Sequence, residues 1–177
     1  MIVGLVGKKE SGKCSVALEL VDRHGFRLMS FAKPLKSMLH VFLSNYGLTA
    51  EQLVFAQENK EVEIQGLGVS YRVLAQTLGA EWGRALYPDV WAKIGRRWAI
   101  HYGGDIVFDD VRFENESDVI RDLGGRIVHI VRPGLLPTDV HISERGVLVR
   151  PGDVVITYGG ALPELIVKVF AALGVGV

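Results

Sequence analysis

The chain has 177 residues, of which 49% are hydrophobic and 23% are charged, so it is long enough to form one domain with a substantial core. Twenty Lys and Arg residues balance twenty Asp and Glu residues, which excludes the net positive charge expected of a protein that grips polymeric nucleic acid. The single cysteine, Cys14, excludes an internal disulfide framework.

The first predicted element is an apolar strand at residues 2–6, which leads directly into a glycine-containing loop and an amphipathic helical pattern. The loop has the length and spacing of a phosphate-binding loop, because its glycines let backbone N–H groups converge and Lys13 can reach the outer phosphates. We therefore predict a nucleoside-triphosphate site formed by Gly7, Lys8, Glu10, Ser11, Gly12, Lys13, Cys14 and Ser15.

This loop departs from the strict pattern at one position. Cys14 stands where a Ser or Thr hydroxyl would contact Mg²⁺, and Ser15 follows one residue later. Cysteine is a poor ligand for a hard cation, so we expect Mg²⁺ to be held by waters, phosphates and a distant carboxylate. The alternative, an ordinary glycine turn between a strand and a helix, leaves the lysine and the flanking patterns without an explanation.

Further apolar runs at residues 27–30, 105–108, 126–131 and 153–157 alternate with helical patterns. This alternation predicts an α/β fold with three layers, in which helices cover both faces of a mostly parallel five-stranded sheet. Because the first loop begins at Gly7, we expect no cleaved signal segment and a cytoplasmic protein. The apolar stretch at residues 161–177 contains Pro163, Glu164 and Lys168, which predicts an amphipathic helix rather than a membrane span.

A long helical interval separates the second and third predicted strands. We expect helices at residues 34–42, at 50–57 with Thr49 as N-cap, and at 73–86, with a mobile loop at 59–70. An interval of this length is far longer than a crossover needs. We therefore expect a single domain whose core is about 1–33 and 104–177, with an insertion at about 34–103 that binds the acceptor and is the first lid candidate. The irregular stretch 132–152 is a second lid candidate.

Polar residues follow the predicted strands at the sheet edge where ligands bind in such folds. The strand before residue 109 ends in Asp109 and Asp110, which could support a metal, and Arg112, which could grip a phosphate. A competing interpretation is that the acid pair caps the next helix and Arg112 neutralises it. Lys33 and Lys36 flank Pro34 at a predicted helix start, where they could hold an acceptor phosphate or simply form a solvated face.

The helical interval also contains candidates for a pocket that holds a base and a phosphate. Arg72 and Gln76 are four residues apart on one helix face, and Trp91 follows a turn, although a tryptophan here can equally fill a core. In the second lid candidate, Arg132 and Arg145 could approach phosphates, and a polar patch comprises Asp139, His141, Ser143 and Glu144. His141 has no partner at metal-ligand spacing, so we expect no zinc site there.

In five places the sequence resembles the phage-type deoxynucleoside monophosphate kinases of the P-loop kinase superfamily. These are residues 7–15; the block Phe31-Ala32-Lys33-Pro34-Leu35-Lys36; Gln76-Thr77-Leu78-Gly79 with Arg84, Pro88, Asp89 and Trp91; Asp110-Val111-Arg112-Phe113 with Asn115 and Glu116; and the cluster His141, Ser143 and Glu144. The resemblance implies Mg²⁺-dependent transfer of the γ-phosphoryl group of ATP to a deoxynucleoside monophosphate, with no polymeric nucleic acid or membrane as partner and with a homodimer as one option.

The resemblance also implies roles for individual residues. Lys13, Arg112 and Asp110 would be catalytic, and Ser15, Asp109 and Asp110 would surround the metal, in part through water. The acceptor pocket would include Lys33, Lys36, Arg72, Gln76, Arg84, Trp91 and Arg132. The chain departs from many relatives at Lys33, where they carry an acid, and at residues 158–160, where they often have an Asn-Asp-Gly-like turn.

Two alternatives to this function remain at the level of the sequence. One is dephospho-coenzyme A kinase or another small-metabolite P-loop kinase, although an acceptor hydroxyl would want a carboxylate base near the position that Lys33 occupies. The other is a module that binds a nucleotide without transferring a phosphate. A GTPase switch would usually have an Asn-Lys-x-Asp guanine reader and a hydroxyl directly after Lys13, and neither is present.

Overall fold

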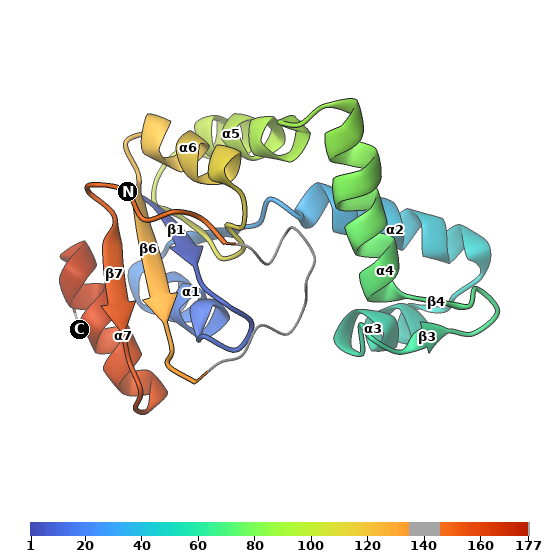
Figure 1. Ribbon diagram of the computed structural model, residues 1–177, viewed down its shortest axis with the longest axis horizontal. Coiled ribbons are helices and arrows are strands. Elements are labelled where there is room, and N and C mark those ends of the chain that lie inside the picture. Colours follow the sequence, from blue (N-terminus) through green and yellow to red (C-terminus); the bar gives the residue numbers. More distant parts are fainter. Residues whose placement is uncertain (135–145, 177) are drawn as a thin grey trace. The chain divides into compact units, whose positions relative to one another are not determined.

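The computed structural model describes residues 1–134 and 146–176 (Figure 1). By its internal contacts the chain forms two compact units, one made of Met1–Phe31 and Ala92–Val177 and the other of Ala32–Trp91. The helix α5 (Val90–Tyr102), which the sequence analysis grouped with the insertion, contributes all but its first two residues to the first unit.

The first unit is built on a five-stranded sheet in the order β2-β5-β1-β6-β7. Every pairing in it is parallel, which confirms the predicted sheet. The strands are β1 (Ile2–Val6), β2 (Arg27–Met29), β5 (Ile106–Phe108), β6 (Arg126–Val131) and β7 (Val154–Thr157). Since β1 lies at the centre, the loop that follows it emerges at the middle of the sheet's carboxyl edge.

Helices cover both faces of this sheet, as the sequence predicted (Figure 1). One core lies beneath α1 (Lys13–His24) and α7 (Leu162–Leu173), and it receives alternate strand residues such as Val107. The neighbouring strand residues Ile106 and Phe108 point to the opposite core, which is closed by α5 and α6 (Glu114–Asp122). Among the described residues, no helix is both long and apolar enough to cross a membrane.

The second unit contains α2 (Lys33–Tyr46), α3 (Ala50–Glu58), the short strands β3 (Glu63–Ile64) and β4 (Val69–Ser70), α4 (Tyr71–Gln76) and a π-helix, η1 (Thr77–Arg84). Its core gathers Leu39, Leu43, Leu53, Ala56, Ile64 and Tyr71. Thr49 caps α3 as predicted: its hydroxyl accepts from the Gln52 N–H while the Gln52 side chain accepts from the Thr49 N–H.

The prediction of a mobile loop at residues 59–70 needs a correction, because part of this segment is regular. These residues contain an antiparallel pair, β3 with β4, in which Ile64 pairs with Val69. Gly66 and Gly68 both have positive φ, at 85° and 67°, and supply the left-handed conformations that the tight connection requires. Strands of two residues are too short to show an alternating pattern, so no strand could be predicted there.

The prediction of one regular helix over residues 73–86 also needs correction, because α4 continues as the wider η1. Two glycines, Gly79 and Gly83, weaken the ordinary helical preference there. The Trp91 indole N–H donates to the Gly79 carbonyl at 2.8 Å, and a Cβ on Gly83 would lie 2.5 Å from the Trp91 ring. The packing of Trp91 therefore explains why residue 83 is a glycine, and the Trp91 hydrogen bond satisfies a carbonyl within η1.

Candidate phosphate-binding site

The loop between β1 and α1 has the backbone that its sequence predicts. Gly12 is the N-cap of α1 with φ of 87°, and Glu10 also has a positive φ, of 65°. A Cβ on Gly12 would lie 2.6 Å from Leu165 Cδ2, and one on Gly7 would lie 2.7 Å from the Ile130 carbonyl oxygen. Both glycines are therefore required by space, and the loop presents backbone N–H groups at a helix N-terminus, which suits an anion.

The ammonium group of Lys13 folds back over this loop. It donates to the carbonyl oxygens of Gly7 at 2.5 Å and Lys8 at 2.6 Å, and it lies 3.4 Å from Ser11 Oγ. Burial and the nearby charge of Arg112 lower the pKa of Lys13 from 10.5 to about 8. The site thus holds its main cation partly desolvated, where it would interact strongly with a phosphate.

Two residues from the ends of β6 and β7 brace the loop from outside. The buried Tyr158 hydroxyl donates to the Ser11 carbonyl at 3.3 Å. Arg132 donates to the Glu10 carbonyl at 3.3 Å, with its guanidinium 5.8 Å from the Tyr158 ring centre. In the sequence, Tyr158 stands out only as a departure from the turn that relatives often have. Its contact with Ser11 joins residues 147 positions apart, so sequence spacing gave no signal for it.

The two carboxylates after β5 point to different partners. Asp109 Oδ2 accepts from the Cys14 thiol at 3.7 Å, at the position where the strict loop pattern has a hydroxyl. Asp110 instead accepts from the Ser30 hydroxyl at 2.6 Å and from the Phe31 N–H at 2.9 Å. Asp109 therefore faces the first turn of α1, whereas Asp110 ties the end of β2 to the end of β5.

Arg112 lies in the turn between β5 and α6, close enough to Lys13 for its charge to lower the pKa of that lysine. The backbone N–H groups of Arg112 and Phe113 both donate to Glu116 Oε2, at 2.9 and 3.2 Å. Glu116 is only 3% exposed. The buried carboxylate of Glu116 thus holds the backbone at the start of α6, a role that its position in the sequence did not indicate.

Of the predicted acceptor residues, Arg132 lies in the first unit, beside the loop, and the others lie in the second unit. Trp91 is buried, and Arg84 donates to the Pro88 carbonyl at 3.0 Å, so these two lie around η1. Arg72 pairs with Glu61 near the start of α4, and Gln76 ends that helix. Lys33 and Lys36 are exposed in the first turns of α2. The structure does not describe the candidates of the second lid candidate between residues 135 and 145, which are Asp139, His141, Ser143, Glu144 and Arg145.

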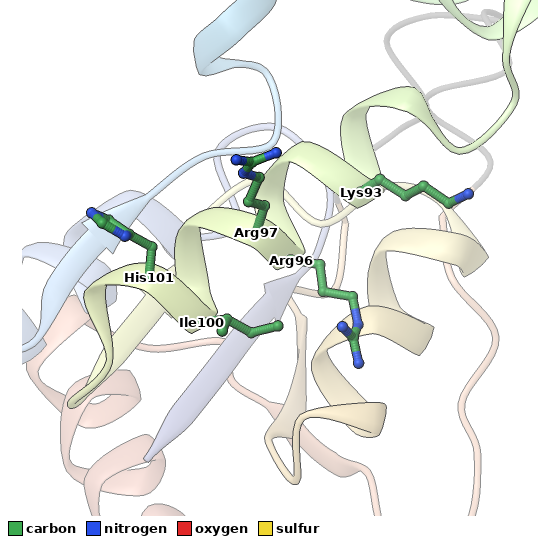
Figure 2. A pocket seen from close by; sticks show the side chains of 5 residues that line it. All are labelled: Lys93, Arg96, Arg97, Ile100 and His101. Carbon is green, nitrogen blue, oxygen red and sulfur yellow. The ribbon is translucent and has the colours of Figure 1, made fainter.

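Two surface depressions lie away from this loop. One of about 660 Å³ lies on α5 and is lined by Lys93, Arg96, Arg97, Ile100 and His101, whose side chains project from successive turns (Figure 2). Another, of about 550 Å³, is lined by residues of α3 and β3 with their neighbours, including Glu51 and Glu63. No residue predicted from the sequence to bind nucleotide lines either depression, so the phosphate site rests on the loop geometry alone.

Comparison with known proteins places this geometry in a family. A family model described as deoxynucleotide monophosphate kinase matches residues 53–169. A protein of Acanthamoeba polyphaga mimivirus, provisionally named deoxynucleotide monophosphate kinase, is 34% identical over 159 residues, which are 81% of this chain and 80% of that protein. The deoxynucleotide monophosphate kinase of Escherichia phage RB69 is 36% identical over 108 residues, 56% of this chain and 43% of the phage protein.

Among solved structures, shikimate kinase from Aquifex aeolicus is similar in fold. It has a TM-score of 0.53 and 13% sequence identity, and the match covers 98% of this chain and 96% of that one. At this identity the similarity concerns the fold alone, and it supports the predicted P-loop kinase architecture.

Proposed function

The chain belongs to the deoxynucleotide monophosphate kinase family, the phosphotransferases that phosphorylate deoxynucleoside monophosphates, and on this premise we propose that its donor is ATP, bound at residues 7–15. The observation that carries the proposal is the arrangement of Lys13 over a loop in which Gly7 and Gly12 admit no side chain. We further propose that the enzyme acts in the cytoplasm on free nucleotides.

We propose that the donor phosphates lie against the loop N–H groups, with Lys13 on the transferred phosphoryl group. Phosphoryl transfer has a loose transition state that demands in-line positioning and positive charge more than covalent help. Lys13 supplies one cation, and Arg112, whose charge acts on Lys13, supplies a second. Arg132 braces the Glu10 carbonyl and adds a third positive charge at the edge of the loop.

The residues around the loop fit a bound Mg²⁺. Mg²⁺ in phosphotransfer sites usually binds through one or two carboxylates plus substrate phosphates, and Asp109 lies beside the first turn of α1. We propose that Asp109, which faces Cys14, and Ser15 hold it, in part through water. When bound, Mg²⁺ would neutralise charge on the donor phosphates.

This assignment separates the two neighbouring aspartates. We expect Asp109→Asn to raise the Mg²⁺ concentration for half-maximal activity by about tenfold or more, with little change in melting temperature. Asp110→Asn should instead lower the free energy of unfolding by about 1–2 kcal/mol, because an amide cannot accept from both Ser30 and Phe31 in the same way. Magnesium titrations and urea unfolding of both variants check this, and exchanged phenotypes would contradict it.

For the acceptor we propose the second unit, with Lys33, Lys36, Arg72, Gln76, Arg84 and Trp91 contributing to the pocket. The support is that Arg84 ends η1 and the buried Trp91 donates to the Gly79 carbonyl of the same helix, and π-helical segments occur frequently at functional sites. Leu35, between the two lysines, lies 3.5 Å from a Cβ built on Gly79 of η1, so the start of α2 packs beside the same helix.

A direct assay tests the proposed function. Purified protein should convert ATP and at least one deoxynucleoside monophosphate to ADP and the diphosphate in Mg²⁺, and should turn over ATP far more slowly without an acceptor. Activity with dephospho-coenzyme A but with no monophosphate would favour the other kinase class. Binding of ATP with no transfer to any acceptor would favour a non-catalytic module.

The pKa of Lys13 predicts how nucleotide affinity depends on pH. Below pH 8 the lysine is charged in the free protein, whereas above pH 8 it must take up a proton when phosphate binds. The dissociation constant for ATP should therefore rise above pH 8, by up to about tenfold per pH unit, until the higher pKa of the complex is reached. Equilibrium titrations from pH 7 to 10 check this, and Lys13→Arg, which keeps its charge, should remove the rise.

A further inference from the structure

The segment that precedes β7 is latched onto the first turn of α6. Arg150 donates from Nη2 to Glu114 Oε2 at 2.8 Å and from Nη1 to Asp118 Oδ1 at 2.6 Å. The Leu148 N–H donates to the other oxygen of Glu114 at 2.6 Å. Because Glu114 and Asp118 are four residues apart on α6, a single guanidinium spans one turn at the start of this helix.

The latch is anchored at its other end by a buried carboxylate. The side chain of Asp153 is 3% exposed and accepts from the Arg150 N–H at 2.9 Å. It also accepts from Arg121 Nη2 at 2.7 Å and lies 3.0 Å from His129 Nε2. Burial alone would raise the pKa of Asp153, but hydrogen bonds from Arg121, the Arg150 backbone and His129 lower it to about 2. Asp153 is therefore ionised at neutral pH and holds the backbone of Arg150 in place.

The same turn of α6 fixes the backbone of Arg112. Glu116, inside this turn, accepts from the N–H groups of Arg112 and Phe113. A displacement of the helix start would therefore displace Arg112. Partly exposed ion pairs such as those of Arg150 contribute only about 0–1 kcal/mol to the free energy of unfolding. Their contribution to stability is therefore a weak explanation for this arrangement.

Resting on the proposed function, we propose that Arg150 is a positioning residue for phosphoryl transfer, which clamps Glu114 and Asp118 and thereby holds the turn that carries Arg112. Arg150 would affect kcat through the position of Arg112, because a misplacement of about 1 Å at a reacting centre can lower the rate about 10²-fold. The Arg150 guanidinium holds Glu114 and Asp118, and its backbone N–H donates to Asp153.

The test compares Arg150→Ala with Arg126→Ala. Arg126 is a matched control because its guanidinium also joins two elements of the first unit, by donating to the Ala172 carbonyl at 2.9 Å, but away from α6. We expect Arg150→Ala to lower kcat about tenfold with both KM values changed less than about twofold, and Arg126→Ala to leave kcat within about twofold. Arg150→Lys, which can reach one carboxylate at a time, should recover part of kcat.

A double-mutant cycle with Arg112→Ala separates positioning from a general structural role. If Arg150 acts through Arg112, adding Arg150→Ala to Arg112→Ala should lower kcat no further, and amide hydrogen exchange at residues 112–118 should be faster in Arg150→Ala than in the unmutated chain. Additive losses of kcat, unchanged exchange, or equal kcat in Arg150→Ala and Arg126→Ala would overturn the proposal. An unmutated chain without transfer activity would overturn the proposed function as well, so the two failures are distinguishable.

Discussion

Lys13→Ala should lower kcat by about 10³-fold, since it removes the charge placed over the phosphate-binding loop. The ammonium is partly desolvated, as its pKa of about 8 shows, so its interaction with a phosphate is stronger than that of a solvated lysine. Alanine also removes the burial cost of the ammonium, so the variant should fold with an undiminished melting temperature. Steady-state rates at saturating ATP and acceptor, together with thermal unfolding, measure both effects.

The control for this variant is Arg23→Ala at the opposite end of the same helix. Arg23 forms an ion pair with Glu19, one turn earlier in α1, so its removal deletes one positive charge from the helix at the end opposite the loop. Activity in Arg23→Ala should stay within about twofold of the unmutated chain. If Lys13→Ala were as active as Arg23→Ala, residues 7–15 would not be the donor site.

The parts of this fold that could be predicted from sequence are those encoded by local spacing. The loop at residues 7–15 carries its glycines and lysine within nine residues, and the central strands β1 and β5 are continuous apolar runs because they are buried on both faces. Thr49 and Gln52 form a capping box within four residues. In each case the residues that form the pattern are close together in the chain, so a short stretch of sequence is enough to recognise it.

The parts that could not be predicted depend on contacts between distant residues. The sequence grouped Asp109 with Asp110, yet Asp110 is directed by Ser30 and Phe31, about eighty positions away, and Asp109 by Cys14. The widening of residues 77–84 into a π-helix likewise follows the packing of Trp91 on Gly83. The role of each aspartate therefore depends on which distant residue donates a hydrogen bond to it. That residue cannot be identified from residue type and spacing in the sequence.

Arg112→Ala is the second variant for which we expect a large effect, a fall in kcat of about 10²–10³-fold with the KM for ATP changed less than about threefold. The reason is that a guanidinium beside the transferred group stabilises charge that develops only in the transition state. Arg112→Lys should recover part of kcat, because it restores the charge but not the planar pair of donors. Initial rates over a matrix of ATP and acceptor concentrations separate kcat from KM.

The same variant makes a second, independent measurement possible. Burial and the charge of Arg112 together lower the pKa of Lys13, so removing the guanidinium should raise that pKa above 8. The pH above which ATP affinity begins to fall should then shift upward in Arg112→Ala, whereas Arg126→Ala should leave it in place, since Arg126 donates to Ala172 at another part of the unit. A lower kcat without this shift would mean that Arg112 acts on the acceptor side and not beside Lys13, and an unchanged kcat would remove Arg112 from the reaction altogether.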